Sequence, residues 1–186
     1  MLKKFGDSLK TAFSALEASK AQPEDQLKHP IVQLMHELGR LLGSKVVATT
    51  EAPVAELNGR PDVAISVDGS VTGHVELKAP GKGARPTKYK GADARQWKKF
   101  KNHPNLIYTD GNEWALYRTG ERKGKLVNFS GDVTTDGGGV VSTDNARDLE
   151  ALLRDFTGWE PIVPTSPQPF TPRVLWAHSV TVLPTL

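Results

Sequence analysis

Apolar and polar residues alternate in two short stretches of the chain, residues 62–67 and residues 74–79. A period of two is the pattern of a β-strand that buries one face. The residues between the two stretches include Asp68-Gly69-Ser70, and an Asp-Gly pair favours a tight turn. The sequence therefore predicts a β-hairpin with one apolar face and one polar face.

The polar face of this hairpin carries two acids and a lysine. Asp62 lies on the first strand, and Glu76 and Lys78 share the same face of the second strand. A five-residue connection centred near Ser70 places Asp62 roughly opposite Lys78 and diagonal to Glu76. The alternative interpretation is a charged strand face that is simply solvated.

Two carboxylates held this close repel each other, and a divalent cation removes that repulsion. A few hard oxygen ligands, with water completing the shell, suit Mg²⁺, and Mn²⁺ is expected to substitute for it. Such an ion lowers the pKa of bound water and holds a phosphodiester oxygen. Lys78 could orient the attacking water and stabilise the developing negative charge. The hairpin therefore predicts a metal-dependent phosphodiesterase site.

The remaining patterns predict helices on both sides of further strands. Apolar residues recur at helical spacing over residues 2–20, and a second helix has Pro30 in its first turn and Gly43 at its end. Residues 134–144, with three consecutive glycines, are expected to form a flexible loop. Further strands are expected at residues 45–49, 105–110, 112–118 and 125–130, and further helices at residues 92–101 and around 149–156. This order predicts an α/β fold with a mixed central β-sheet flanked by helices.

Positive charge is concentrated in one segment. The chain has a formal net charge of +3, yet eight of its basic residues and only one acid, Asp93, lie between Lys82 and Lys101. Such a patch is typical of a surface that meets a phosphate backbone. A solvated helix face, or a surface that binds an acidic protein, is the alternative. The DNA-binding candidates are Lys82, Arg85, Lys88, Lys90, Arg95, Lys98 and Lys99.

Composition excludes several classes of protein. The chain has no cysteine, so it has no disulfide, thiol nucleophile or cysteine-zinc site, and this suits a reducing cytoplasm. No apolar run approaches the roughly 20 residues that span a bilayer, so no membrane association is expected. From Pro161 the chain has five prolines in twelve residues and no periodicity, which predicts a linker or tail where a longer protein would continue.

Two motifs resemble those of known nucleases. Pro61-Asp62 followed by Glu76-Leu77-Lys78 resembles the motif of the PD-(D/E)xK nuclease superfamily. Residues 96–100, Gln-Trp-Lys-Lys-Phe, resemble the Gln-x-x-x-Tyr helix of the branch that contains helicase-linked nucleases, with Phe100 in place of the usual tyrosine. About residues 25 to 160 are similar to the N-terminal nuclease domain of single-polypeptide restriction-modification enzymes, in which helicase-like and adenine-methyltransferase domains follow.

The resemblance implies a restriction-endonuclease-like core and a Mg²⁺-dependent DNA endonuclease of a restriction-modification or DNA-defence system. It divides the chain into an N-terminal helix (1–24), a nuclease domain (25–160) and a Pro-rich linker or tail (161–186). It assigns catalytic roles to Asp62, Glu76, Lys78 and Gln96, and metal ligation to Asp62, Glu76 and the main-chain carbonyl of Leu77.

An acid from the preceding helix often completes such sites. Glu37 is the candidate here, although it could instead pair with Arg40, and Glu51 and Glu56 are weaker substitutes. The alternative function is a catalytically silent DNA-binding module of the same fold, a remnant of a larger helicase and methyltransferase protein.

Overall fold

The structure, a computed structural model, describes residues 1–16, 22–50 and 59–160. The predicted tail, residues 161–186, lies outside the described residues, as do Glu51 and Glu56. Within the described ranges, no helix is both long enough and apolar enough to cross a membrane.

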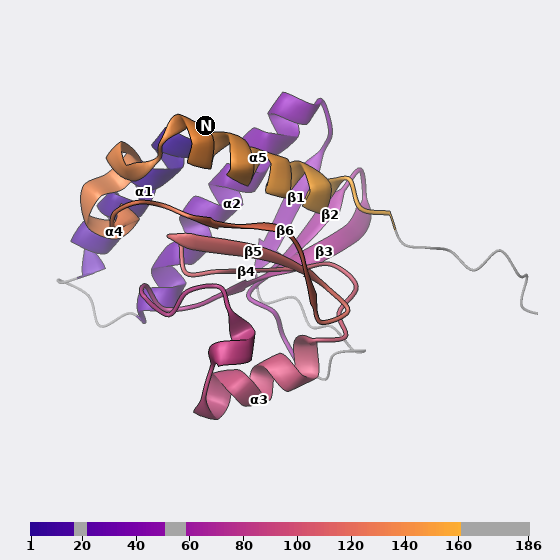
Figure 1. Cartoon of the computed structure of the whole chain (residues 1–186). Helices are drawn as coiled ribbons and strands as arrows, with labels where there is room; N and C mark the ends of the chain where they lie inside the picture. Colours follow the sequence, from indigo (N-terminus) through magenta and orange to yellow (C-terminus); the bar gives the residue numbers. More distant parts are fainter. Residues whose placement is uncertain (17–21, 51–58, 161–186) are drawn as a thin grey trace, which may run out of the picture.

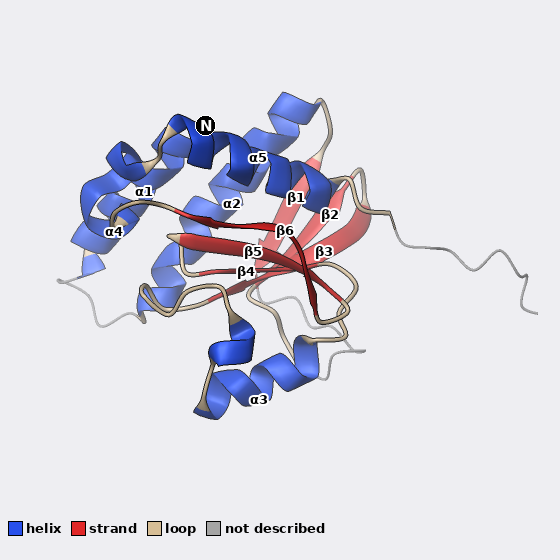
Figure 2. Cartoon of the chain, in the orientation of Figure 1, coloured by secondary structure: helices blue, strands red, loops and turns tan. Residues whose placement is uncertain are grey.

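Six strands form one sheet in the order in which they occur in the chain (Figures 1 and 2). They are β1 (Val46–Thr50), β2 (Val63–Val67), β3 (Ser70–Leu77), β4 (Leu106–Thr109), β5 (Glu113–Arg118) and β6 (Glu121–Asn128). Only β3 and β4 pair in parallel, and the other neighbours are antiparallel. Because parallel neighbours need a crossover connection, the chain leaves the sheet between them and returns through a helix.

Helices cover both faces of this sheet (Figure 1). They are α1 (Leu2–Ser14), α2 (Pro23–Leu42), η3 (Pro86–Lys88), α3 (Gly91–Phe100), α4 (Val133–Asp136), η4 (Gly137–Val140) and α5 (Thr143–Thr157). The crossover helix α3 lies on one side, and α1, α2 and α5 lie on the other. The predicted α/β class with a mixed central sheet is confirmed, and it is compatible with a restriction-endonuclease-like core.

The main hydrophobic core lies between the sheet and the helices α1, α2 and α5. Val63, Ile65, Val75 and Leu77 are fully buried in it, as the alternating pattern predicted. Helix α1 belongs to the same core through Leu2, Phe5 and Leu9, which are all buried.

A second, smaller cluster lies where α3 packs on β4 and β5, and its residue Tyr108 is the register neighbour of Glu76. It contains Phe100 of α3 and the sheet residues Tyr108 and Tyr117, with Trp97 and Tyr89 packed against them. The polar side chains of β3 are consequently not on a solvated strand face: Glu76 is 1% exposed and Lys78 is 2% exposed. Burial of two ionisable groups is costly unless they are paired or bind a ligand.

Helix α2 begins at Pro23, one and a half to two turns before the start that the sequence predicted. Pro30 lies inside the helix rather than in its first turn, because the apolar stripe extends back to Leu27, which is fully buried. Gly43 ends the helix with a left-handed backbone (φ 70°), as predicted.

The segment expected to be a flexible loop is instead the short helices α4 and η4. Asp132 caps α4 by accepting from the N–H of Thr134, and the N–H of Gly138 donates to Asp7 of α1. A Cβ on Gly138 would lie 2.3 Å from the carbonyl oxygen of Lys3. The glycines therefore allow the backbone of η4 to lie close to the backbone of α1. This contact is long-range, so the local composition does not reveal it.

Candidate active site

The β2–β3 register places Asp62 beside Glu76. Val63 pairs with Val75 and Ala64 with His74, so the same register extended by one residue brings Asp62 opposite Glu76. The prediction that Asp62 faces Lys78 and is diagonal to Glu76 is wrong. The turn is a two-residue connection, Asp68-Gly69, with both φ angles positive, and the pairing is irregular at Ile65 and Ser66, where the register shifts by one residue.

The four side chains assigned catalytic roles meet at the exit of this hairpin. An oxygen of Asp62, Oδ2, accepts from the N–H of Leu77 at 2.8 Å. The ammonium group of Lys78 donates to Glu76 Oε1 at 2.9 Å and to Gln96 Oε1 at 2.7 Å. Gln96 comes from α3, so the helix on the second face of the sheet fixes the position of the lysine.

The proline before Asp62 affects the main chain of Leu77. In the extended register Pro61 lies opposite Leu77, and antiparallel partners exchange N–H and C=O groups. The N–H of Leu77 already donates to Asp62, and proline has no N–H with which to reach the Leu77 carbonyl. The Pro-Asp pair therefore leaves that carbonyl without its ladder donor, on the residue that lies between Glu76 and Lys78 in the chain.

The helix acid that approaches the site is Glu24, not Glu37. Glu24 lies in the first turn of α2, accepts from the N–H of Ala79 at 2.9 Å, and acts electrostatically on Asp62. Glu37 lies about 20 Å further along the helix axis. It pairs there with Lys4 and, at 3.8 Å, with Arg40. The structure therefore does not bring Glu37 to Asp62 and Glu76.

A second acid that the sequence did not point to is Asp93 of α3. Its Oδ1 lies 3.5 Å from the ammonium of Lys78, and its Oδ2 lies 2.8 Å from that of Lys82. Asp93 stands three residues before Gln96, so both side chains lie on neighbouring positions of one helix face. The only acid of the basic segment thus holds one lysine of that segment, Lys82, and the lysine of the candidate active site, Lys78.

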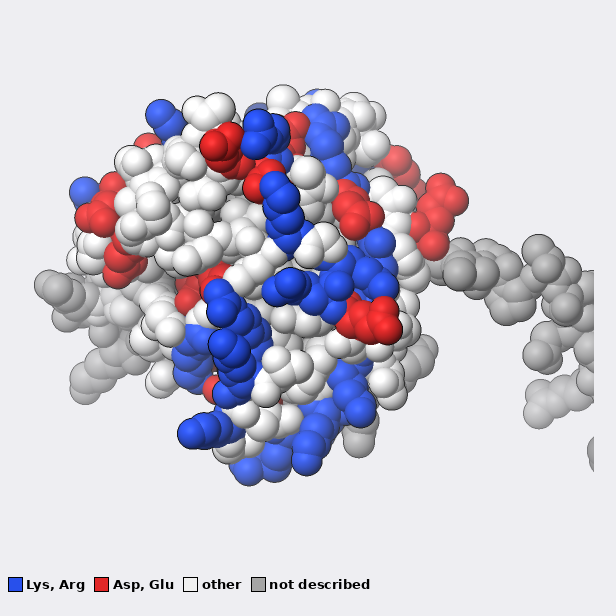
Figure 3. Space-filling view, in the orientation of Figure 1, with Lys and Arg blue, Asp and Glu red and all other residues white. Residues whose placement is uncertain are grey.

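The basic residues predicted to bind DNA fall into two groups. Lys82 pairs with Asp93, and Arg85 pairs with Glu113 at 2.8 Å. The other five form no ion pair with any residue that the structure describes: Lys88, Lys90, Arg95, Lys98 and Lys99. Lysine and arginine side chains gather on the part of the molecule where α3 lies (Figure 3).

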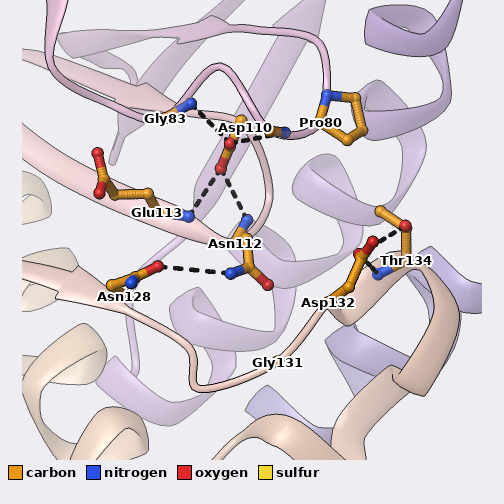
Figure 4. Close-up of a pocket in the computed structure, with 10 residues that line it drawn as sticks. Pro80, Gly83, Asp110, Asn112, Glu113, Asn128, Gly131, Asp132 and Thr134 are labelled. Carbon is orange, nitrogen blue, oxygen red and sulfur yellow. Dashed lines mark hydrogen bonds between the residues drawn. The ribbon is translucent and has the colours of Figure 1, made fainter.

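The segment between β3 and α3, which carries Lys82, Arg85, Lys88 and Lys90, is attached to the sheet by two buried acids. Asp110 accepts from the N–H groups of Gly81 and Gly83 through Oδ2, and from those of Asn112 and Glu113 through Oδ1 (Figure 4). Glu113 accepts in turn from the N–H of Ala84. These bonds fix the segment that follows Lys78, so its position depends on the β4–β5 turn.

The two central carboxyls hold their protons more tightly than usual. Burial raises the pKa of Asp62, against the lowering effects of the Leu77 N–H and of Lys78. Burial and the charge of Asp62 together raise the pKa of Glu76 to about 8. Burial opposes the charge on Lys78, but Glu76 and neighbouring acids outweigh it, so the pKa of Lys78 is raised. The state in which both Asp62 and Glu76 are ionised is therefore the energetically unfavourable one.

This electrostatic imbalance predicts that stability falls with rising pH. A carboxyl whose pKa is raised on folding stabilises the folded chain while protonated, and that contribution is lost as pH rises through about 8. One proton corresponds to about 1.4 kcal/mol per pH unit, or roughly 3–6 °C in the thermal midpoint. Without divalent ions, the midpoint should therefore fall by several degrees between pH 7 and pH 9.

Calorimetry with and without Mg²⁺ checks this expectation. The window above pH 7 is chosen because the buried His74 and His103 have lowered pKa values and are neutral there in both states. Mg²⁺ should raise the midpoint more at pH 9 than at pH 7. The Glu76→Gln variant should show neither dependence, and an equal slope in that variant would assign the effect elsewhere.

The residues present fit a hard divalent cation. Glu76 Oε2 is buried and has no hydrogen-bond partner among the described residues, which leaves one carboxylate oxygen available as a ligand. Within residues 1–16, 22–50 and 59–160, no three acid or histidine side chains form a ready metal cluster. An ion would be held by Asp62, Glu76, the Leu77 carbonyl and water, a ligand set that suits Mg²⁺.

Comparison with known proteins supports the fold. No family model matches the sequence, and no curated protein is similar to it in sequence. A solved structure with a similar fold is the electron cryomicroscopy structure of a DrdV–DNA complex, with a TM-score of 0.54 and 18% identity. The likeness covers 86% of this chain and only 14% of that chain. This chain is thus similar in fold to a small part of a much longer, DNA-bound protein.

Proposed function

We propose that this chain is a Mg²⁺-dependent DNA endonuclease domain that hydrolyses phosphodiester bonds. The observation that carries the proposal is the meeting of Asp62, Glu76, Lys78 and Gln96 at one partly buried point of the sheet. Two carboxyls with raised pKa values beside a fixed ammonium group are a costly arrangement, and such arrangements gather at functional sites. The fold likeness to a protein bound to DNA supports DNA as the polymer.

Each side chain has a distinct part in this chemistry. A bound Mg²⁺ supplies a Lewis acid and lowers the pKa of its water. Asp62, Glu76 and the Leu77 carbonyl would hold the ion. Lys78 donates to the attacking water and to the phosphate oxygen on which negative charge develops. Gln96 accepts from Lys78 at 2.7 Å and so keeps its ammonium group in place.

The unpaired basic residues supply the contacts that position DNA. Lys88, Lys90, Arg95, Lys98 and Lys99 are available for phosphate oxygens, since no described acid neutralises them. Phosphate contacts fix orientation and carry no base sequence. Sequence choice would then come from other domains, such as the helicase and methyltransferase parts of a restriction-modification or DNA-defence protein.

Cleavage of a supercoiled plasmid tests the proposal. With Mg²⁺ the chain should convert supercoiled DNA to nicked or linear forms, and excess EDTA should stop the reaction because the carboxylates then lack their ion. Mn²⁺ should restore it. DNA binding that weakens with salt, without any cutting in either metal, would support the catalytically silent module instead.

A further inference from the structure

A hollow of about 340 Å³ lies beside the candidate active site, between α3 and the segment that leads into β2. Its cationic lining residues are Arg60, Arg95 and Lys99, and none of the described residues that line it is an acid. We propose that this hollow, called the α3 hollow below, holds one sugar–phosphate unit of the DNA strand next to the phosphodiester that is cut. The inference rests on the proposed function and assigns a subsite to it.

Geometry makes the α3 hollow continuous with the candidate active site. Gln96 also lines it, and the same side chain accepts from Lys78 at 2.7 Å. Arg60 stands two residues before Asp62, so one stretch of backbone borders both the α3 hollow and the candidate active site. A strand whose phosphate lies at Asp62 and Glu76 would therefore place its neighbouring unit here.

Charge favours an anion in the α3 hollow. Arg60, Arg95 and Lys99 are all exposed and form no ion pair with any residue in the described ranges. Three like charges that converge on one space repel one another, and a phosphate placed among them removes that repulsion. Lys82 and Arg85, by contrast, already have carboxylate partners.

The size and the lining of the α3 hollow favour a ligand larger than a phosphate ion. Ala92 and Phe100 also line the α3 hollow, so an apolar surface lies beside the cations. An apolar wall with a few convergent polar groups is typical of a site for an organic ligand. A sugar–phosphate unit presents both characters, a negatively charged oxygen cluster and an apolar ring face.

Helix periodicity provides a matched control on the same helix. The lining positions 92, 95, 96, 99 and 100 form one face of α3. Lys98 is an exposed lysine like Lys99, but it lies about 120° around the helix from the centre of that face. Neutralising Lys98 removes a positive charge from α3 without altering the α3 hollow.

The test separates the effect of removing a positive charge from the effect of filling the α3 hollow. Duplex DNA binding is measured by fluorescence anisotropy in EDTA. Three single variants are compared: Arg60→Gln, Ala92→Trp and Lys98→Gln. Two double variants combine Ala92→Trp with Arg60→Gln or with Lys98→Gln. Arg60→Gln should lower the slope of log K against log salt by about 0.9. Ala92→Trp fills the α3 hollow without changing charge, and it should weaken binding about tenfold.

The combined variants decide the outcome. Once the tryptophan at position 92 excludes the DNA backbone from the α3 hollow, adding Arg60→Gln should cause no further loss of DNA affinity. Adding Lys98→Gln to the same variant should still cause its full loss. The proposal is overturned if Ala92→Trp binds like the wild type, or if Arg60→Gln costs the same in both backgrounds. Because binding is measured without divalent ions, this result stands whether or not the wild type cuts DNA. Thermal midpoints close to wild type would show that these exposed substitutions leave the fold intact.

Discussion

Replacing Glu76 with glutamine is expected to lower the rate of Mg²⁺-dependent plasmid cleavage at least about 1,000-fold. Glutamine has nearly the same shape but no charge, so Asp62 and the Leu77 carbonyl would have to hold the ion without a second carboxylate. A loss of this size corresponds to about 4 kcal/mol of transition-state stabilisation, within the range expected of a metal Lewis acid.

The same variant should remain folded, and at pH 8 it should be at least as stable as the wild type. The reason is that Glu76 is 1% exposed, and burial raises its pKa, so its ionised form costs folding free energy that glutamine does not. The matched control is Glu150→Gln, which removes an exposed carboxylate on α5 that pairs with Arg154. If Glu76→Gln cuts as fast as Glu150→Gln, the assignment of the site is wrong.

Replacing Lys78 with methionine is expected to slow cleavage by about 100-fold to 1,000-fold. Methionine fills the buried space of the lysine stem but cannot donate to the attacking water or to the phosphate. Removal of one preorganised donor at a developing anion typically has an effect of this size. Single-turnover rates at saturating Mg²⁺ would measure it.

Metal binding should survive the loss of Lys78, with a shift in pH. Lys78 lowers the pKa of Glu76, so without the lysine the carboxyl keeps its proton to higher pH. Mg²⁺ should therefore still raise the thermal midpoint at pH 9, and less so at pH 7. Lys82→Met is the comparison, since Lys82 shares Asp93 with Lys78 but its side chain is 44% exposed, and cleavage by this variant should slow less than about tenfold. Equal losses in the two variants would reduce the role of Lys78 to general positive charge.

The faces of the hairpin were predictable because the period of a strand is local. Val63, Ile65 and Val75 were expected on the buried face, and the structure places all three in the main core. Asp62, Glu76 and Lys78 were therefore correctly assigned to the other, polar face of the hairpin. Because they share this face, they meet in the structure. The exact register was not predictable, because it depends on the two backbone angles of the turn and on the register shift at Ile65 and Ser66.

The sequence contained a signal for the start of α2 near Glu24, but the proline at position 30 gave a competing signal. Pro23 at the first helical position with Glu24 and Asp25 in the first turn is a sound start signal for a helix. Pro30 offered a competing start that placed Glu24 outside the helix. Packing of Leu27 resolves the competition in favour of the earlier start, and Glu24 then comes to the end of α2 that faces Ala79.

Ion pairs across the basic segment could not be predicted from sequence. Lys82 and Asp93 are eleven residues apart, and Arg85 and Glu113 are twenty-eight apart, so the fold alone decides which charges are neutralised. A charge count treats the seven DNA-binding candidates as equal. The structure shows that two of them have carboxylate partners, and only the remaining five form no ion pair with a described residue.

The packing of α1 bears on how small an autonomous version of this protein can be. Leu2, Phe5 and Leu9 fill part of the main core, and Gly6 lies so close to Gly138 that a Cβ there would be 2.7 Å from its nitrogen. A fragment starting at residue 25 would therefore expose a large apolar cavity and lose Glu24 as well. We therefore expect the minimal folding unit of this domain to include its first residues, because trimming to residues 25–160 would remove structural support and Glu24 together.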